Sequence, residues 1–153
     1  MKYFRYGLIV TLLLACTSAA FAAEIFNGYA GTPWGTDMAA VMKAFPKGQT
    51  AQAHGGGTMY RQDRPNDNIA LRMFNFKDSK LSGVSVKFSE EYVQKSGIDN
   101  ILAQHKKAYG EGKIDRSQAP HMITYIWEGP KTKISFAYAP KGLDMTIMLF
   151  EAK

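Results

Sequence analysis

Cysteine is almost absent from this 153-residue sequence, in which Cys16 is the single example. Cys16 lies in an N-terminal segment that we expect to be removed, so the mature chain would contain no cysteine at all. This excludes structural disulfides, thiolate nucleophiles and cysteine metal clusters from the mature chain. About 130 mature residues must then be stabilised by a hydrophobic core, which is enough chain for one domain and hardly for two.

Histidine is also scarce, and its three examples lie far apart at His54, His105 and His121. No two of them have the spacing of a helical metal pair, and the carboxylates occur mostly singly, at turns and helix starts. The serines lack a G-x-S-x-G context. The sequence therefore predicts no metal, no cofactor and no catalytic residue, and it favours a protein that is not an enzyme. The alternative is an envelope enzyme with a dispersed site of histidine and carboxylate around His54 and His121.

A long uncharged run occurs only at the N-terminus, from Tyr6 to Cys16, where it follows Lys2 and Arg5. Small residues in an A-x-A arrangement come next, which completes the layout of a secretory signal peptide. We expect residues 1–22 to be the signal peptide and residues 23–153 to form a single domain. The mature chain would then be periplasmic or secreted, without a transmembrane segment.

The letters "LLAC" that end at Cys16 leave an alternative for the location. They resemble the lipobox of bacterial lipoproteins, in which Cys16 would be lipidated and would anchor the chain to a membrane. The small residues before Ala23 favour ordinary cleavage instead.

Charge of one sign is not concentrated anywhere. The predicted signal peptide contains two of the 19 basic residues and none of the 13 acidic ones, which leaves the mature chain with a net charge of +4. The basic residues are scattered and never exceed two in a row. For an exported chain we therefore expect no nucleic-acid partner, and we expect a protein or peptide of the envelope instead.

The stretch "GTPWGTDMAAVMKAFP" predicts a short amphipathic helix. Thr36 stands at the N-cap position, and Asp37 lies in the first turn. Apolar residues recur at helical spacing at Met38, Val41, Met42 and Phe45. Pro46 ends the pattern. Trp34 precedes the cap by two residues, where it can pack onto the first turn as a hydrophobic staple.

Six short apolar runs separated by polar turns predict strands. They are Thr58 to Arg61, Ile69 to Phe76, Leu81 to Phe88, Met122 to Trp127, Thr132 to Tyr138 and Leu143 to Phe150. A second helix is predicted from Ser89 to Gly110, with Gly97 weakening its middle. The predicted fold is α+β, an antiparallel sheet of about six short strands with two helices on one face. A 62-residue offset that places Phe74 on Phe136 leaves open a duplicated helix-plus-strands unit.

Aromatic residues suggest an interaction surface. Tyr125 and Trp127 fall on one side of their strand, and we expect them to be exposed if the other side packs on the helices. Arg61 and Arg72 on neighbouring strands would be their cationic companions. The alternative is that the aromatic pair closes the core edge or is covered by the N-terminal segment. The loops at 47–57 and 110–120 are further candidate contact regions.

The Trp34-Gly35-Thr36 step, followed by Val41 and Phe45, resembles the start of small exported bacterial proteins of unassigned function. More distantly, a capped helix followed by strands, repeated, is similar to the α-β-β units of outer-membrane assembly lipoproteins and of β-lactamase-inhibitor-like domains. These families act by binding proteins, so the resemblance implies a non-enzymatic binding or adaptor domain of the cell envelope. It carries over no binding residue.

Overall fold

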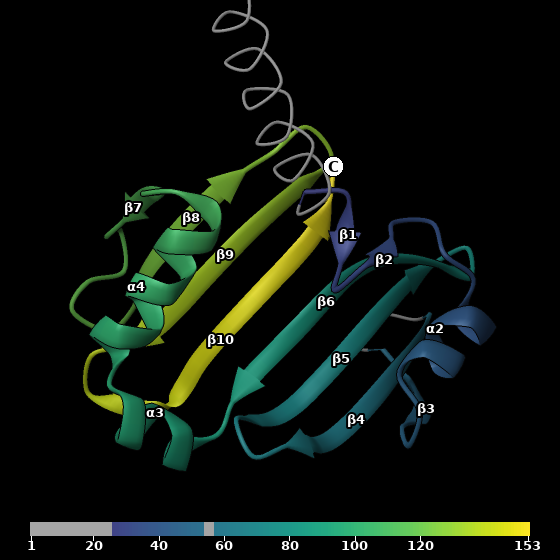
Figure 1. The fold of residues 1–153 in the computed structure, drawn as a ribbon, viewed down its shortest axis with the longest axis horizontal. Coiled ribbons are helices and arrows are strands. Elements are labelled where there is room, and N and C mark those ends of the chain that lie inside the picture. The colour runs from purple at the N-terminus through teal and green to yellow at the C-terminus, as the bar shows by residue number, and fades with distance from the viewer. Residues whose placement is uncertain (1–25, 54–56) are drawn as a thin grey trace, which may run out of the picture.

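The computed structural model describes residues 26–53 and 57–153 (Figure 1). The predicted signal peptide, the lipidation candidate Cys16 and His54 lie outside these ranges. In the part of the chain that is described, no helix has the length and apolar character needed to cross a membrane.

Eight strands form one antiparallel sheet in the order β3-β4-β5-β6-β10-β9-β8-β7. The strands of the first half are β3 (Gln49–Gln52), β4 (Thr58–Asn66), β5 (Ile69–Lys77) and β6 (Lys80–Phe88). Those of the second half are β7 (Lys113–Asp115), β8 (Ile123–Glu128), β9 (Thr132–Ala139) and β10 (Gly142–Ala152). The two halves meet at the β6–β10 pair in the centre of the sheet. A separate hairpin is formed by β1 (Gly28–Tyr29) and β2 (Thr32–Pro33).

The predicted class of six strands and two helices is wrong, because the described residues form ten strands and three helices and are mostly β. All six predicted runs overlap strands of the large sheet. The runs that were missed, β3 and β7, are sheet edges in which every residue is exposed. Such strands show no alternation of apolar and polar residues. β1 and β2 are too short to produce a pattern.

Each half of the chain runs through helix and then four strands, and the strand order is symmetric about the β6–β10 pair. Val86 and Met148, which the 62-residue offset relates, lie directly opposite each other in this pair. The centre of the sheet is therefore also the boundary between two units of the same element order.

Three helices, α2 (Met38–Ala44), α3 (Glu90–Ser96) and α4 (Ile98–Tyr109), lie on the same side of the sheet (Figure 1). The second predicted helix is divided into α3 and α4 at Gly97, whose φ of +77° is strained for any residue with a side chain. The hydroxyl of Ser89 accepts from the backbone N–H of Tyr92 and caps α3, as expected.

The predicted cap of α2 is corrected by one residue. Asp37 occupies the N-cap without a side-chain cap bond, and the Thr36 hydroxyl donates to the Pro33 carbonyl at 2.7 Å. This segment is held by the sheet, because the N–H of Leu81 donates to the Thr36 carbonyl at 2.9 Å and Lys80 pairs with the Asp37 carboxylate at 2.8 Å. Pairing with the start of β6 thus decides where the helix begins.

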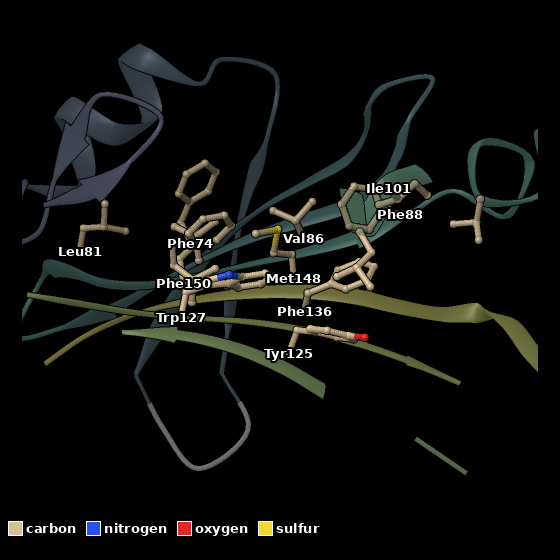
Figure 2. Packing of buried hydrophobic residues seen from close by; sticks show 14 of the residues in the cluster. Phe74, Leu81, Val86, Phe88, Ile101, Tyr125, Trp127, Phe136, Met148 and Phe150 are labelled. Atoms are coloured by element: carbon tan, nitrogen blue, oxygen red, sulfur yellow. The ribbon is translucent and has the colours of Figure 1, made fainter. Parts of the chain in front are cut away.

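The hydrophobic core lies between the helices and the sheet (Figure 2). Fully buried side chains in it include Val41 of α2, Ile101 of α4, Phe74 of β5 and Phe136 of β9. A sheet covered on one side in this way needs apolar residues at alternate strand positions, which the sequence of β6 provides.

Trp34 is half-buried and packs against this core. Its Nε1 donates to the Thr132 hydroxyl at 2.7 Å, and that hydroxyl donates to the carbonyl of Phe26 at 2.6 Å. Trp34 thus connects the N-terminal segment to the start of β9, a long-range contact that the staple interpretation did not include.

Candidate functional site

A groove with a volume of about 710 Å³ opens on the helical side of the sheet, between the β1–β2 hairpin and α4. Its floor consists of apolar side chains from the three strands β5, β6 and β10, namely Ile69, Val86, Phe88, Met148 and Phe150. One wall is the hairpin segment 27–33. The other is formed by His105, Ala108 and Tyr109 of α4.

The groove follows from the way the two halves cover the sheet. Each half contributes its own helix or helix pair, and the central β6–β10 pair lies between these covering units (Figure 1). Val86 and Met148 at this junction face the helical side, since directly opposed residues of neighbouring strands share a face. The floor is therefore apolar like the core, although no helix among the described residues lies on it.

The hairpin wall turns at Ala30 and Gly31, whose φ values are +47° and +78°. Two residues with positive φ form the type of tight turn that matches the twist of a hairpin. Tyr29 fixes the hairpin to the sheet, because its ring packs edge-on against Phe150 with the ring centroids 4.9 Å apart. The guanidinium of Arg72 lies 5.7 Å from the centroid of the same ring.

The α4 wall contains an imidazole within a cluster of aromatic rings. The ring centroid of His105 is 5.1 Å from that of Phe136, 6.0 Å from that of Phe88 and 6.1 Å from that of Tyr109. Its Nε2 is buried and has no hydrogen-bond partner in the described part of the protein. Burial lowers the pKa of His105 from its ordinary 6.5 to about 4, so the imidazole is neutral at neutral pH.

The two tyrosines of the lining are neutral as well. Burial raises the pKa of Tyr29, an effect that the nearby Arg72 partly offsets. Burial also raises the pKa of Tyr109, with a smaller contribution from Tyr29. The lining contains no Lys, Arg, Asp or Glu among the residues described. At neutral pH the groove therefore presents no charged side chain to a ligand.

Tyr125 and Trp127 are not the exposed pair that we expected. They lie opposite Phe136 and Ile134 of β9 on the helical face, and their exposed fractions are 7% and 3% (Figure 2). α4 covers this face, where large aromatic rings gain most from burial. The Trp127 Nε1 donates to the Gly110 carbonyl at 2.8 Å, at the end of α4. The alternative reading, in which the pair belongs to the core, describes this geometry.

The two arginines are not companions of this pair, because three strands separate β5 from β8 in the sheet. Arg61 is exposed and pairs with Asp63 at 2.6 Å. Arg72 lies on the helical side, where its guanidinium carbon is 5.4 Å from the Phe45 ring centroid and its Nη1 donates to Gln62 at 3.1 Å. The cation nearest to the Tyr125 ring is instead the Lys106 ammonium of α4, at 5.6 Å.

The histidines of the enzyme alternative are not brought together in the described structure. His121 is exposed, and His54 lies outside the described ranges. Between Phe26 and Lys153, without residues 54–56, no three His, Cys, Asp or Glu side chains gather as metal ligands would. Each of the two candidate loop regions contains a short edge strand. Region 47–57 contains β3, and region 110–120 contains β7.

Sequence reasoning missed the groove because its residues come from five separate segments that each look like ordinary core. His105 and Tyr109, for example, lie within the range of the second predicted helix. One wall did have a sequence signal. Ala30 and Gly31 stand between the segments "GY" and "TP", and two turn residues that include a glycine are compatible with a tight hairpin.

Comparisons with known proteins find few matches. No protein-family model matches the chain, and no curated protein matches it. The chain is similar to the crystal structure of YjgB, a DUF4309 family protein from Bacillus subtilis subsp. subtilis str. 168, with 12% sequence identity and a TM-score of 0.43. The similarity covers 77% of this chain and 79% of that one.

Proposed function

We propose that the chain is an exported, non-enzymatic binding domain of the cell envelope and that the groove over the β6–β10 pair is its ligand site. The groove itself is the observation that carries this proposal. Its volume of about 710 Å³ lies within the range of sites for small organic ligands, about 300–1,000 Å³. Its apolar floor would bury a ligand with gain from the hydrophobic effect.

The titratable side chains of the lining support a binding role over catalysis. A general acid or base works best with a pKa near the pH of the reaction. Burial moves the pKa of His105 down to about 4 and the pKa values of Tyr29 and Tyr109 up. Each shift takes its group further from neutral pH and stabilises the uncharged form.

The ligand site can be tested with a neutral apolar fluorophore, N-phenyl-1-naphthylamine. We expect the fluorophore to bind the exported chain and Ala108→Trp to weaken the binding by about tenfold or more, because Ala108 is an exposed residue of the groove wall. The matched control is Ala103→Trp, which alters an exposed alanine of the same helix outside the groove.

Comparison of Ala108→Trp with Ala103→Trp distinguishes binding in the groove from binding elsewhere on the surface. Equal binding by both variants and the unchanged chain would contradict the groove as the ligand site. Circular dichroism of each variant checks that α4 is intact.

Export and an envelope partner remain predictions from the sequence. The mass of the N-terminus of the exported chain tests the first, since ordinary cleavage gives a chain that starts at Ala23 and lipidation gives one that starts at modified Cys16. Affinity capture from envelope extracts tests the expected protein or peptide partner. A chain that retains residues 1–22 and stays in the cytoplasm would contradict the proposed location.

A further inference from the structure

The floor and walls of the groove specify the body of a ligand. Val86, Met148 and Phe150 are buried apolar side chains, and no polar side chain interrupts the floor. The cavity of about 710 Å³ is equivalent to about 24 water molecules at about 30 Å³ each. A ligand that fills it and gains from the hydrophobic effect needs an apolar body of more than a few carbon atoms.

The absence of charged side chains in the described lining indicates that the ligand carries no charge. A charged group that enters an apolar site without a partner of opposite sign loses its hydration and gains nothing in return. The described lining offers no Lys, Arg, Asp or Glu. The aromatic rings around His105 keep its imidazole neutral, so it does not supply a cation either. The Arg72 guanidinium, which packs on the Tyr29 ring at 5.7 Å and donates to Gln62, is not part of this lining. The lining itself therefore favours a neutral ligand.

Two polar residues of the walls indicate one further feature of the ligand. Tyr109 of α4 and Asn27 of the hairpin segment are on opposite walls, and neither side chain has a hydrogen-bond partner among the residues that the structure describes. A hydroxyl and an amide both donate and accept hydrogen bonds. They can therefore bind a neutral polar head while the ligand's body lies on the floor.

We infer that the groove takes an uncharged single-chain amphiphile, with an aliphatic body and a neutral hydrogen-bonding head of the kind found in long-chain alcohols. The inference rests on the proposed function and names the ligand class of the same site. It is independent of whether the amphiphile is free or belongs to an envelope lipid, because the shared chemistry is the neutral head and the aliphatic chain.

Three compounds with the same chain length and different heads test the inference. 1-Dodecanol is neutral, dodecanoate is an anion and dodecyltrimethylammonium is a cation at pH 7. Each is titrated, below its micelle concentration, against the exported chain with N-phenyl-1-naphthylamine bound. We expect dodecanol to displace the fluorophore with an affinity about tenfold or more above that of either charged compound. Comparable or tighter binding of dodecanoate or of the cation would overturn the inference.

The outcomes distinguish the two proposals. If the fluorophore does not bind, or if Ala108→Trp leaves its binding unchanged, the proposed function fails. If the fluorophore binds in the groove but no dodecyl compound displaces it, the proposed function stands and the aliphatic ligand class is overturned. If dodecanol does displace it, vesicles that contain a neutral monoacylglycerol, compared with dodecanol, distinguish a membrane source from a free one.

A charge placed on the wall gives a second test. Ala108→Lys puts an ammonium beside the groove at an exposed helix position that tolerates lysine. We expect the affinity for dodecanoate to rise about tenfold relative to dodecanol, because the carboxylate now has a partner. Ala103→Lys should leave both affinities within about twofold. An equal change in the two variants would contradict the placement of the ligand's head beside α4.

Discussion

His105 is a polar side chain in apolar surroundings, and its behaviour should depend on pH. Its ring packs among Phe88, Tyr109 and Phe136, and its buried Nε2 has no partner in the described protein. The folded chain therefore binds a proton at this imidazole less readily than the unfolded chain does. As the pH falls from 6.5 towards 4, the unfolded state takes up a proton that the folded state does not.

The first prediction concerns the free energy of unfolding of His105→Phe. Between pH 7 and pH 4 the unchanged chain should lose about 2 kcal/mol more than the variant, after allowance for the part of the ring that stays solvated. Above about pH 7.5 this difference in slope should vanish, since both states then hold the imidazole neutral. Urea titrations at pH 7, 5.5 and 4 measure the effect.

The control for this prediction is His121→Gln, which removes an exposed histidine. Its free energy of unfolding should fall between pH 7 and pH 4 by as much as that of the unchanged chain. The assignment to His105 would be contradicted if His105→Phe lost stability on acidification as steeply as the unchanged chain.

Thr132 is fully buried and joins two distant segments through one hydroxyl. We expect Thr132→Val to lower the free energy of unfolding by about 1–3 kcal/mol, because the Trp34 Nε1 and the Phe26 carbonyl both lose their partner. Trp34→Phe should cost less after Thr132→Val than before it, by about 1 kcal/mol in a double-mutant cycle. Chemical denaturation of the four chains measures this coupling.

The matched control is Thr124→Val, a half-buried threonine of the neighbouring strand. Its effect should stay within about 0.5 kcal/mol. If Thr124→Val lowered the free energy of unfolding as much as Thr132→Val, the effect would not come from the hydrogen bonds of Thr132 to Trp34 and Phe26.

Among the elements, the β1–β2 hairpin has a strained residue in its turn. Ala30 adopts a φ of +47°, a conformation in which asparagine is far less strained than alanine. We expect Ala30→Asn to raise the free energy of unfolding by about 0.5–1 kcal/mol. Thermal unfolding monitored by circular dichroism measures the change.

A second asparagine variant shows whether the gain comes from the turn. Ala39→Asn in α2 should instead lower stability by about 0.5 kcal/mol, because asparagine is a poorer helix former than alanine. A loss in both variants would contradict the assignment of strain to the hairpin turn.

The elements also show what local pattern can and cannot predict. The apolar runs of β6 and β9 were predicted as strands, and the second helix was predicted to start at Ser89, whose hydroxyl caps α3. β3 lacked a signal because "QTAQ" is exposed on both faces and has no alternation of apolar and polar residues. The start of α2 was misplaced because Lys80 and Leu81, distant in sequence, hold the preceding segment.

In the whole molecule, the β6–β10 pair carries the connection between the halves. We predict that in native-state hydrogen exchange the amides of β6 and β10 exchange only with global unfolding, whereas those of the exposed edges β3 and β7 exchange at least about tenfold faster. Two halves that open independently would instead leave β6 and β10 no better protected than the edges, which would contradict a single cooperative unit.

The sequence did not show which face of the sheet the helices cover. Tyr125 and Trp127 were placed together on one side of their strand, which is right, but alternation does not say which side the helices cover. The groove is a property of how α4 and the hairpin are spaced over the strands, and spacing of this kind has no local sequence signal.

The groove gathers residues from almost the full length of the described chain, from Asn27 in the first hairpin to Phe150 in the last strand. β10 completes its floor, so a nascent chain has no complete groove until β10 has been synthesised and has joined the sheet. A chain that crosses a membrane unfolded would arrive empty and would acquire its ligand only at its destination. The proposed amphiphile, if it is found bound after purification, would therefore identify the compartment in which the protein folds.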